Sequence, residues 1–590
     1  MKNLQRYVLG ALTFLLVSVG AIAAPEQAWM QESNRNSQVL LDTIAQFSPE
    51  SAQELGVDGY DEQVTDLKPQ VYERSNQVLE AAIAELRTRK AKSSDAAVMQ
   101  DLDILIRAGE DNLNSAHLQH DLILPYVGVP RLVFGGLRGL LDARIPAERQ
   151  AAALARLRRY AGIEPGSTPI TELAKARTVE RFGEKNLVGP FRGEVEQDLA
   201  DSPRLMQGIR KLFTASRLTG YDEALNTLEA QFKDYDAWVT RDILPRARAD
   251  HRLPPALYAD NLKQVGVDVA PEELMRRALV SFEEIQNEMR ALAPLVAKQK
   301  GIKATDYRGV IRALKKQQVQ GKAILPLYTQ RLHQIEAILR REHEITVPQR
   351  NAVIRLASEA ESAMIPAPNM SPPRLIGNTG EYGEFVLPLN VPGKTGEKSL
   401  KTDDFTYDAA AWTLTAHEAR PGHELQFAAM IERGVSIARA VFAFNSVNVE
   451  GWALYSEAEM KPYFPLDGQL IGLQHRLMRA ARAYLDPMVN LGLLTPAQVH
   501  DVLVNDVVLS EGMAKQEVDR YTFRAPGQAT AYFFGYQSLM ETRRRAELAL
   551  AAKFDKQRFH DFILAQGLLP PALLQKAVMK EFVPAELARK

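Results

Sequence analysis

The 590-residue sequence contains no cysteine. A chain without cysteine forms no disulfide bonds and has no thiol at which a bacterial lipid anchor could be attached. A zinc site in such a chain has to be built from histidine and carboxylate side chains, because these are the remaining common zinc ligands.

The sequence also lacks an excess of charge of either sign. Its 72 Lys and Arg residues balance 73 Asp and Glu residues, so the formal net charge is −1. No overall field attracts nucleic acid or anionic lipid to such a chain, and we expect no nucleic-acid partner. The hydrophobic fraction of 46% and the charged fraction of 25% are typical of globular proteins, and the length allows a large core or two lobes.

Long apolar runs are confined to the N-terminus. Lys2 and Arg6 precede an apolar run over 7–22, which ends in the small residues around Ala23. This layout predicts a secretory signal peptide over 1–23. An uncleaved membrane anchor is the alternative, although the run is short for one. We therefore expect a periplasmic or secreted protein without lipidation and without stable membrane insertion after cleavage.

The first part of the mature chain is patterned as helix. Apolar residues recur at intervals of three and four between clusters of Pro and Gly. The clearest such segments are 71–88, 95–108, 272–295 and 324–339. We predict a mainly α fold in which 24–590 forms one catalytic domain.

The pattern changes at Pro366. A loop is expected over 367–373, and the Gly, Asn and Pro residues around Phe385 predict a small hairpin or β-ribbon within 374–390. Pro388 would place its strand at an edge of the ribbon. An extended peptide could pair with such an edge. A ribbon that only stabilises the fold is the alternative.

The central motif is the stretch LTAHEARPGHELQ over 414–426. Zinc peptidases use two imidazoles to bind the metal and a neighbouring carboxylate, here Glu418, to activate water. In the usual H-E-x-x-H motif the two histidines are four residues apart, whereas His417 and His423 are six apart. At about 100° per residue, six residues rotate the second imidazole by about 240°, so a regular helix cannot bring both to one ion.

Pro421 and Gly422 lie inside this longer spacing. Because Pro interrupts the helical ladder and Gly tolerates unusual backbone angles, we expect a bulge that returns His423 to the side of His417. The alternative is two ordinary polar residues near a helix break.

A third metal ligand is expected in the stretch NVEGWALYSE over 448–457. Glu450 and Glu457 are seven residues apart on an otherwise apolar segment, so they share one helix face. Acids on such a face are costly unless they are paired or bind a metal. We assign Glu450 as the third zinc ligand and expect Glu457 to orient a ligand imidazole. For Glu450 the alternative is an ion pair with an arginine of the next helix (Arg476, Arg479 or Arg482).

Several hydrogen-bond donors surround the turn at Pro526. Amide hydrolysis passes through an oxyanion, which such donors stabilise. We predict Tyr521 and Tyr532 as catalytic donors and Arg524 and Gln528 as substrate-binding residues. Aromatic core packing is the alternative for this segment. His560, in the last helical segment over 554–570, is expected to be structural.

Four motifs in this order resemble the bacterial domain of unknown function 885 family, and a similarity over 55–66 extends the resemblance to nearly the whole mature chain. The motifs are His-Glu-Ala-x-Pro-Gly-His at 417–423, Glu-Gly-Trp-Ala-Leu-Tyr at 450–455, Arg-Tyr with Pro-Gly-Gln-Ala at 520–521 and 526–529, and Phe-His-Asp with Gly-Leu-Leu-Pro at 559–561 and 567–570.

The resemblance implies a zinc peptidase of the gluzincin type, akin to angiotensin-converting enzyme and the oligopeptidases. It implies a deep channel between two helical lobes, which we place at about 24–365 and 366–590. It also implies zinc on His417, His423 and Glu450. Many members carry an Asp-x-x-x-His arrangement in the helix after the Trp-Ala motif; here the corresponding residues are Asp486 and Asn490, so no role for that His carries over.

Together these patterns predict a periplasmic zinc metallopeptidase that acts on short peptides, with Glu418 as the general base. A non-catalytic periplasmic binding or scaffold protein that keeps the fold is one alternative, although such a protein has no need of Glu418. A zinc hydrolase of another amide or an ester is the other alternative, and the motifs do not separate it from a peptidase.

Overall fold

The computed structural model describes residues 27–142, 144–358, 361–362, 365, 367–378, 380–388 and 402–589. The expected signal peptide lies outside these residues. The described chain is mainly helical, as predicted, with one three-stranded sheet. Within the described ranges, no helix is both long and apolar enough to cross a membrane.

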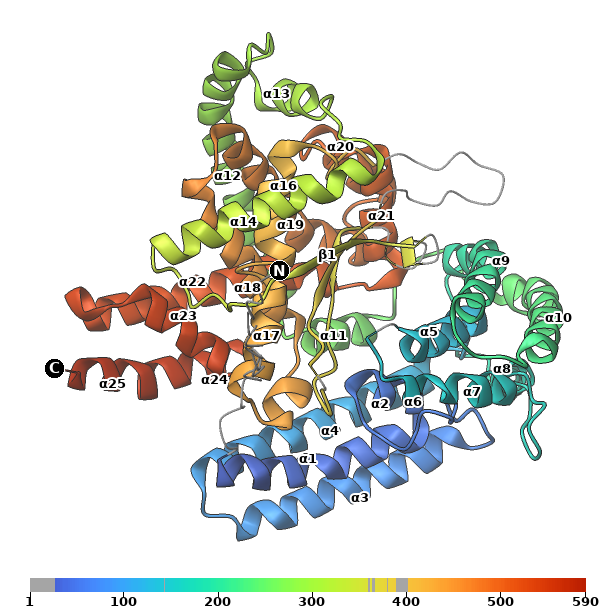
Figure 1. The fold of residues 1–590 in the computed structure, drawn as a ribbon. Coiled ribbons are helices and arrows are strands. Elements are labelled where there is room, and N and C mark those ends of the chain that lie inside the picture. The colour runs from blue at the N-terminus through green and yellow to red at the C-terminus, as the bar shows by residue number, and fades with distance from the viewer. Residues whose placement is uncertain are drawn as a thin grey trace, which may run out of the picture.

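The first helices lie along one edge of the molecule (Figure 1). The long helices of this group pack lengthwise on one another around a core that includes Leu40, Leu86 and Leu102. The group consists of α1 (Ala28–Phe47), α2 (Pro49–Leu55), α3 (Val71–Lys92) and α4 (Ala96–Leu122).

A second helical group, drawn in teal and green in Figure 1, has its own core around Phe134, Leu157, Ile209 and Phe232. Its helices are α5 (Val129–Leu141), α6 (Ala147–Gln150), α7 (Ala152–Tyr160), α8 (Ile170–Val179), α9 (Arg192–Ala215) and α10 (Asp222–Trp238).

The largest core joins residues from before and after the segment around 365. Phe282 contacts Tyr484 edge-on with ring centroids 5.5 Å apart, and Tyr328 contacts Phe385 in the same way at 5.5 Å. The first contact lies between α12 and α19, which pack closely along each other. The half that carries the metal motifs therefore shares its core with the helices before it, and the division into two lobes stays a prediction.

The helices around this core are α11 (Pro255–Gln264), α12 (Pro271–Lys300), α13 (Tyr307–Leu314), α14 (Ile324–Arg341), α16 (Asp408–Glu418), α17 (His423–Arg433), α18 (Ser446–Met460), α19 (Leu466–Asn490), α20 (Pro496–Asn505), α21 (Glu511–Asp519) and α22 (Ala531–Leu550). The chain ends in α23 (Lys556–Ala565), α24 (Pro571–Ala577) and α25 (Val583–Ala588).

The periodic segments named above are confirmed as helices, since they fall within α3, α4, α12 and α14 except for Asp95, which caps the start of α4. At the start of α4, the Asp95 side chain accepts hydrogen bonds from the backbone N–H groups of Ala97 and Val98 at 2.8 and 3.0 Å. This cap satisfies two donors that the first helical turn leaves unpaired.

The sheet corrects two predictions. Its strands are β1 (Val353–Leu356), β2 (Asn369–Ser371) and β3 (Glu384–Leu387), in the order β1-β3-β2, so β3 is the central strand and not an edge. Pro388 follows the last paired residue and costs the ladder no hydrogen bond. The expected loop also contains β2, which pairs antiparallel with β3.

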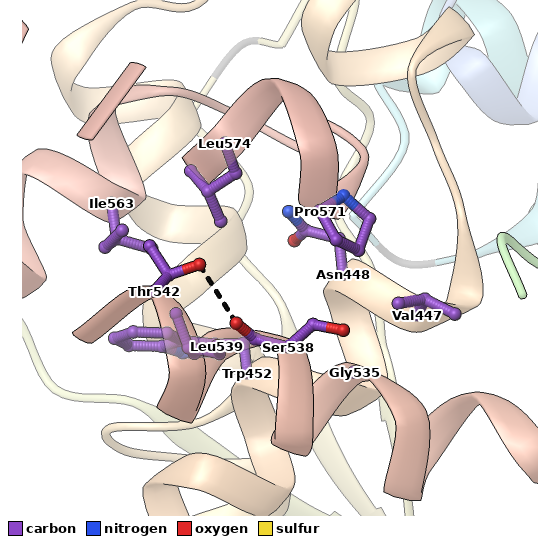
Figure 2. A pocket seen from close by; sticks show the side chains of 10 residues that line it. All are labelled: Val447, Asn448, Trp452, Gly535, Ser538, Leu539, Thr542, Ile563, Pro571 and Leu574. Carbon is purple, nitrogen blue, oxygen red and sulfur yellow. Dashed lines mark hydrogen bonds between the residues drawn. The ribbon is translucent and has the colours of Figure 1, made fainter. Parts of the chain in front are cut away.

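Helices α18 and α22 cross at two glycines. A Cβ on Gly535 would lie 2.0 Å from the carbonyl oxygen of Val447, and one on Gly451 would lie 2.6 Å from the Cα of Gly535. A cavity of about 20 Å³ lies beside this crossing. Figure 2 shows the side chains that line it, among them the apolar Leu539 and Leu574. This volume has room for about one water molecule, so it is a packing gap and not a ligand site.

We expect Gly535→Ala to lower the free energy of unfolding by about 1–3 kcal/mol, because the added methyl group forces α18 and α22 apart. Gly472→Ala in α19 is the matched control, since the nearest atom to its Cβ would be 3.8 Å away. Urea denaturation followed by circular dichroism measures both. Equal stability of the two variants would contradict the close crossing.

Candidate metal centre

The two histidines lie on separate helices, because a short break replaces the expected bulge. Helix α16 ends at Glu418, four residues form the break, and α17 begins at His423. A Cβ on Gly422 would lie 1.9 Å from the carbonyl oxygen of His417. Only glycine fits this approach, which folds the start of α17 back onto the end of α16.

A buried arginine holds the break in place. Arg420 donates from Nε to Glu424 at 2.8 Å and also contacts Glu336. Arg350 binds the other oxygen of Glu424 at 2.6 Å. Trp452 of α18 donates its indole N–H to the carbonyl oxygen of Pro421 at 2.9 Å. The break is thus tied to α14, to α17 and to the helix that carries Glu450.

The structure brings His417, His423 and Glu450 together. Glu450 Oε2 lies 3.3 Å from His423 Nε2 and 3.5 Å from His417 Nε2, and ligand atoms of the three residues all lie within 4.8 Å of one another. Ligands about 2.0–2.1 Å from a tetrahedral zinc ion are about 3.3 Å apart. The two distances from Glu450 match this spacing, and the three side chains together could hold a zinc ion.

The hydrogen bonding of these side chains also fits a cation. Glu450 Oε2 is buried, and among the described residues it pairs only with the imidazoles of His423 and His417 and with no arginine or lysine, which is costly for a carboxylate unless an imidazole is protonated or a cation is bound. The arginines of α19 that could have paired with it bind elsewhere: Arg479 contacts Glu457 at 3.3 Å, and Arg482 binds Glu517 at 2.6 Å. A bound cation would compensate the charge of Glu450.

Glu457 orients His417. Its Oε1 lies 2.7 Å from His417 Nδ1, and Thr413 donates a hydrogen bond to its other oxygen. This is the contact expected from the seven-residue spacing, and it directs His417 Nε2 toward Glu450. Burial by itself raises the pKa of Glu457, but Arg479 and His417 outweigh it and lower the pKa to about 2. Glu457 is therefore a carboxylate at neutral pH.

The protonation of the ligand residues follows from the same contacts. Burial by itself lowers the pKa of His417, but hydrogen bonds to Glu450 and Glu457 raise it to about 9. Burial by itself raises the pKa of Glu450, but hydrogen bonds from His417 and His423 hold it well below its usual range. Without a metal, the carboxylates thus keep a proton on His417, and a cation would have to displace this proton.

Glu418 lies beside the ligand cluster, at the wall of a cavity of about 230 Å³ that His417 also lines. Its Oε1 is 3.9 Å from His417 Nε2. Burial raises the pKa of Glu418 from its ordinary value, against the opposing effect of His417 and His423. Glu424, the other acid of the motif, is bound by arginines, so Glu418 is the acid that faces the cavity.

The four predicted donors fall into two groups. Tyr532 and Arg524 line the cavity, and the ring of Tyr532 stacks on that of His417 with centroids 6.1 Å apart. Tyr521 is fully buried and donates its hydroxyl to Glu517 at 2.7 Å. Gln528 accepts from Arg520. Tyr521 and Gln528 thus hold side chains of the cavity wall and do not line it.

Several lining residues were not predicted to line the site: His475, Arg479, Arg482 and Arg520. The first three are spaced by four and three residues along α19, whose other residues are largely apolar and buried. Polar residues at this spacing share one helix face, which is the signal that could have identified them.

The residues at the Asp-x-x-x-His positions lie away from the metal ligands. Asp486 accepts hydrogen bonds from the Tyr258 hydroxyl at 3.0 Å and from the Gly527 N–H at 2.9 Å, and Asn490 donates to the Tyr521 carbonyl at 3.0 Å. They stabilise the turn at Gly527. His560 is likewise structural, since its ring nitrogens lie 2.7 Å from the Tyr455 hydroxyl and 2.7 Å from the Glu344 carbonyl.

Two solved structures share this fold. A candidate lipoprotein of unknown function from Shewanella oneidensis is similar at a TM-score of 0.71 and 18% identity, over 94% of this chain and 100% of that one. A candidate lipoprotein from Colwellia psychrerythraea is similar at a TM-score of 0.73 and 17% identity, over 96% of this chain and 100% of that one. At 17–18% sequence identity, the similarity establishes a shared fold and nothing about function.

A comparison with curated proteins finds no match. The model of one family, bacterial proteins of unknown function (DUF885), matches residues 49–578, so the resemblance seen in the four motifs is confirmed and the chain belongs to this family.

Proposed function

We propose that this protein is a zinc-dependent hydrolase that cleaves peptide bonds in short peptides. The observation that carries the proposal is the convergence of His417, His423 and Glu450 at the spacing of zinc ligands, beside the cavity-lining Glu418. The predicted leader and the candidate lipoproteins with the same fold support a place outside the cytoplasm.

The two histidines would hold zinc through Nε2, and Glu450 through Oε2. A set of three protein ligands is typical of catalytic zinc sites, whereas structural zinc sites have four. When bound, zinc lowers the pKa of a water molecule to about 7 and polarises a carbonyl group.

The side chains around this site supply the proton transfers. Glu418 takes a proton from water while the water oxygen bonds to the scissile carbonyl carbon, and it then gives the proton to the amide nitrogen. The C–N bond breaks, and a carboxylate and an amine leave. The Tyr532 hydroxyl accepts a hydrogen bond from Arg520 at 3.0 Å, so its own proton is available to the developing oxyanion.

The size of the cavity favours small substrates. A cavity of about 230 Å³ accepts a short peptide segment and excludes a folded protein. A binding or scaffold protein is the weaker alternative, because Glu418 pairs with no arginine or lysine among the described residues and has no evident structural role. Hydrolysis of another amide or an ester would use the same groups.

We expect the purified protein to contain about one zinc ion per chain, and Glu418→Gln to keep the metal while kcat falls about 10²- to 10⁴-fold, since the variant loses its general base. Metal analysis and a panel of short peptides measure both quantities. Chelation should abolish the activity of the wild type, and added zinc should restore it.

Glu432→Gln is the matched control, because Glu432 lies on α17 and binds Arg350 away from the ligands. It should leave kcat unchanged. Unchanged turnover in Glu418→Gln would eliminate the general-base role.

We further expect Glu457→Gln to weaken zinc binding about 10- to 100-fold, because the amide no longer orients and polarises His417 as the carboxylate does. Competition with a chromophoric chelator measures the affinity. Glu459→Gln on the same helix is the control, since Glu459 binds Arg543 at 2.5 Å. If both variants bind zinc equally well, Glu457 has no role in tuning the site.

A further inference from the structure

The wall of the cavity beside Glu418 carries more positive than negative charge. Four arginines line it, against three carboxylates. The arginines are Arg479, Arg482, Arg520 and Arg524, and the carboxylates are Asp404, Glu418 and Glu517. The charges that have no partner inside the protein determine the charge of the ligand that the cavity prefers.

Most of the charges are paired inside the protein. Arg482 makes two hydrogen bonds to Glu517, at 2.6 and 2.7 Å. Asp404 is bound by Lys315 at 2.5 Å, outside the group of lining arginines. Arg479 contacts Glu457 behind the wall at 3.3 Å. These pairs leave the carboxylate of Glu418 and the guanidinium groups of Arg520 and Arg524, so positive charge remains in excess.

Neither of these two arginines has a carboxylate of its own. Arg520 donates to Gln528 and Tyr532, which are neutral, and its nearest carboxylate oxygen, on Glu517, is 3.8 Å away and already bound by Arg482. Arg524 is exposed and has no ion pair among the described residues. A cationic wall of this kind favours an anion in the cavity, since the partly buried charge of Arg520 is costly without a counter-charge.

Hydrogen-bond donors are in surplus as well. Two further lining residues, Arg479 and Gln516, each have a buried nitrogen (Nε and Nε2) without a hydrogen-bond partner in the described chain. A ligand rich in acceptor oxygens matches such a wall better than an amine would.

The ring of Tyr532 lies between His417 and two of the arginines. The Tyr532 ring stacks on His417 with centroids 6.1 Å apart, and the guanidinium carbons of Arg482 and Arg520 lie 4.5 and 5.2 Å from the same ring. One residue of extended peptide spans about 3.3–3.6 Å. A carboxylate one or two residues beyond the scissile bond therefore reaches Arg520, and Arg524 lines the same cavity.

We propose that Arg520 and Arg524 bind the free C-terminal carboxylate of the substrate, so that the enzyme releases single amino acids or dipeptides from the carboxyl ends of short peptides. This inference rests on the proposed function and names its substrate class, an amide whose leaving group carries a carboxylate. The same wall repels the N-terminal ammonium group, which excludes aminopeptidase action.

The test measures binding in the zinc-loaded full chain with Glu418→Gln, so that it does not depend on turnover. The probes are trialanine and trialanine C-terminal amide, which share the free amino end and differ only in the carboxylate. Calorimetry should give the amide a Kd about 10- to 100-fold higher, the range expected for hydrogen bonds to a charged group.

Arg524→Gln and Arg520→Gln, each added to the same background, should reduce this preference by weakening the binding of trialanine while the Kd of the amide changes little. Arg524 is exposed, so its substitution keeps the test valid if Arg520→Gln fails to fold. Arg544→Gln is the matched control, because Arg544 is an exposed arginine of α22 that does not line the cavity.

Equal affinity for the two peptides, binding of neither peptide, or a preference that survives both arginine substitutions would overturn the proposal. Hydrolysis by the wild-type chain is measured separately. If the wild type cleaves peptides but Glu418→Gln shows no preference for the free acid, the carboxylate site is wrong and the hydrolase stands. If the preference holds and no peptide or amide is cleaved, the carboxylate site stands and the hydrolase is wrong.

Discussion

The close approach of Gly422 to the His417 carbonyl is the constraint on which the metal centre depends. A side chain at Gly422 would have to occupy the position of that oxygen, so the backbone can reverse there only with glycine. The reversal lets the first residue of α17 face the last turn of α16. It converts a six-residue spacing, unusable in one helix, into two imidazoles whose rings are 4.8 Å apart.

The surrounding charges separate acids that arginines bind from acids that no arginine or lysine binds among the described residues. Glu424 sits between Arg420 and Arg350, and Glu517 is bound by Arg482, so both charges are neutralised locally. Glu450 has only imidazoles around its inner oxygen. A buried carboxylate without an arginine or lysine partner is costly, and a cation bound between Glu450 and the two imidazoles would offset this cost. The contrast explains why acids of similar burial have different roles.

Helix α19 connects the large core to the site. One side of it packs on α12, while His475, Arg479 and Arg482 point to the cavity and to Glu457. A long helix packed in this way holds guanidinium groups rigidly, which makes their charge effective at a fixed distance from the metal ligands. The mobile end of a surface loop could not do this.

The sequence by itself determined the helical class and the three residues of the candidate metal site, because both depend on residue type and short-range spacing. It also determined the pairing of Glu457 with His417, since residues seven apart share a helix face. Only the tertiary structure decided that β3 is a central strand, that Tyr532 and not Tyr521 reaches the cavity, and which arginines remain without a carboxylate. These depend on which distant segments meet, and the local pattern around each residue is the same whether its partner is present or absent.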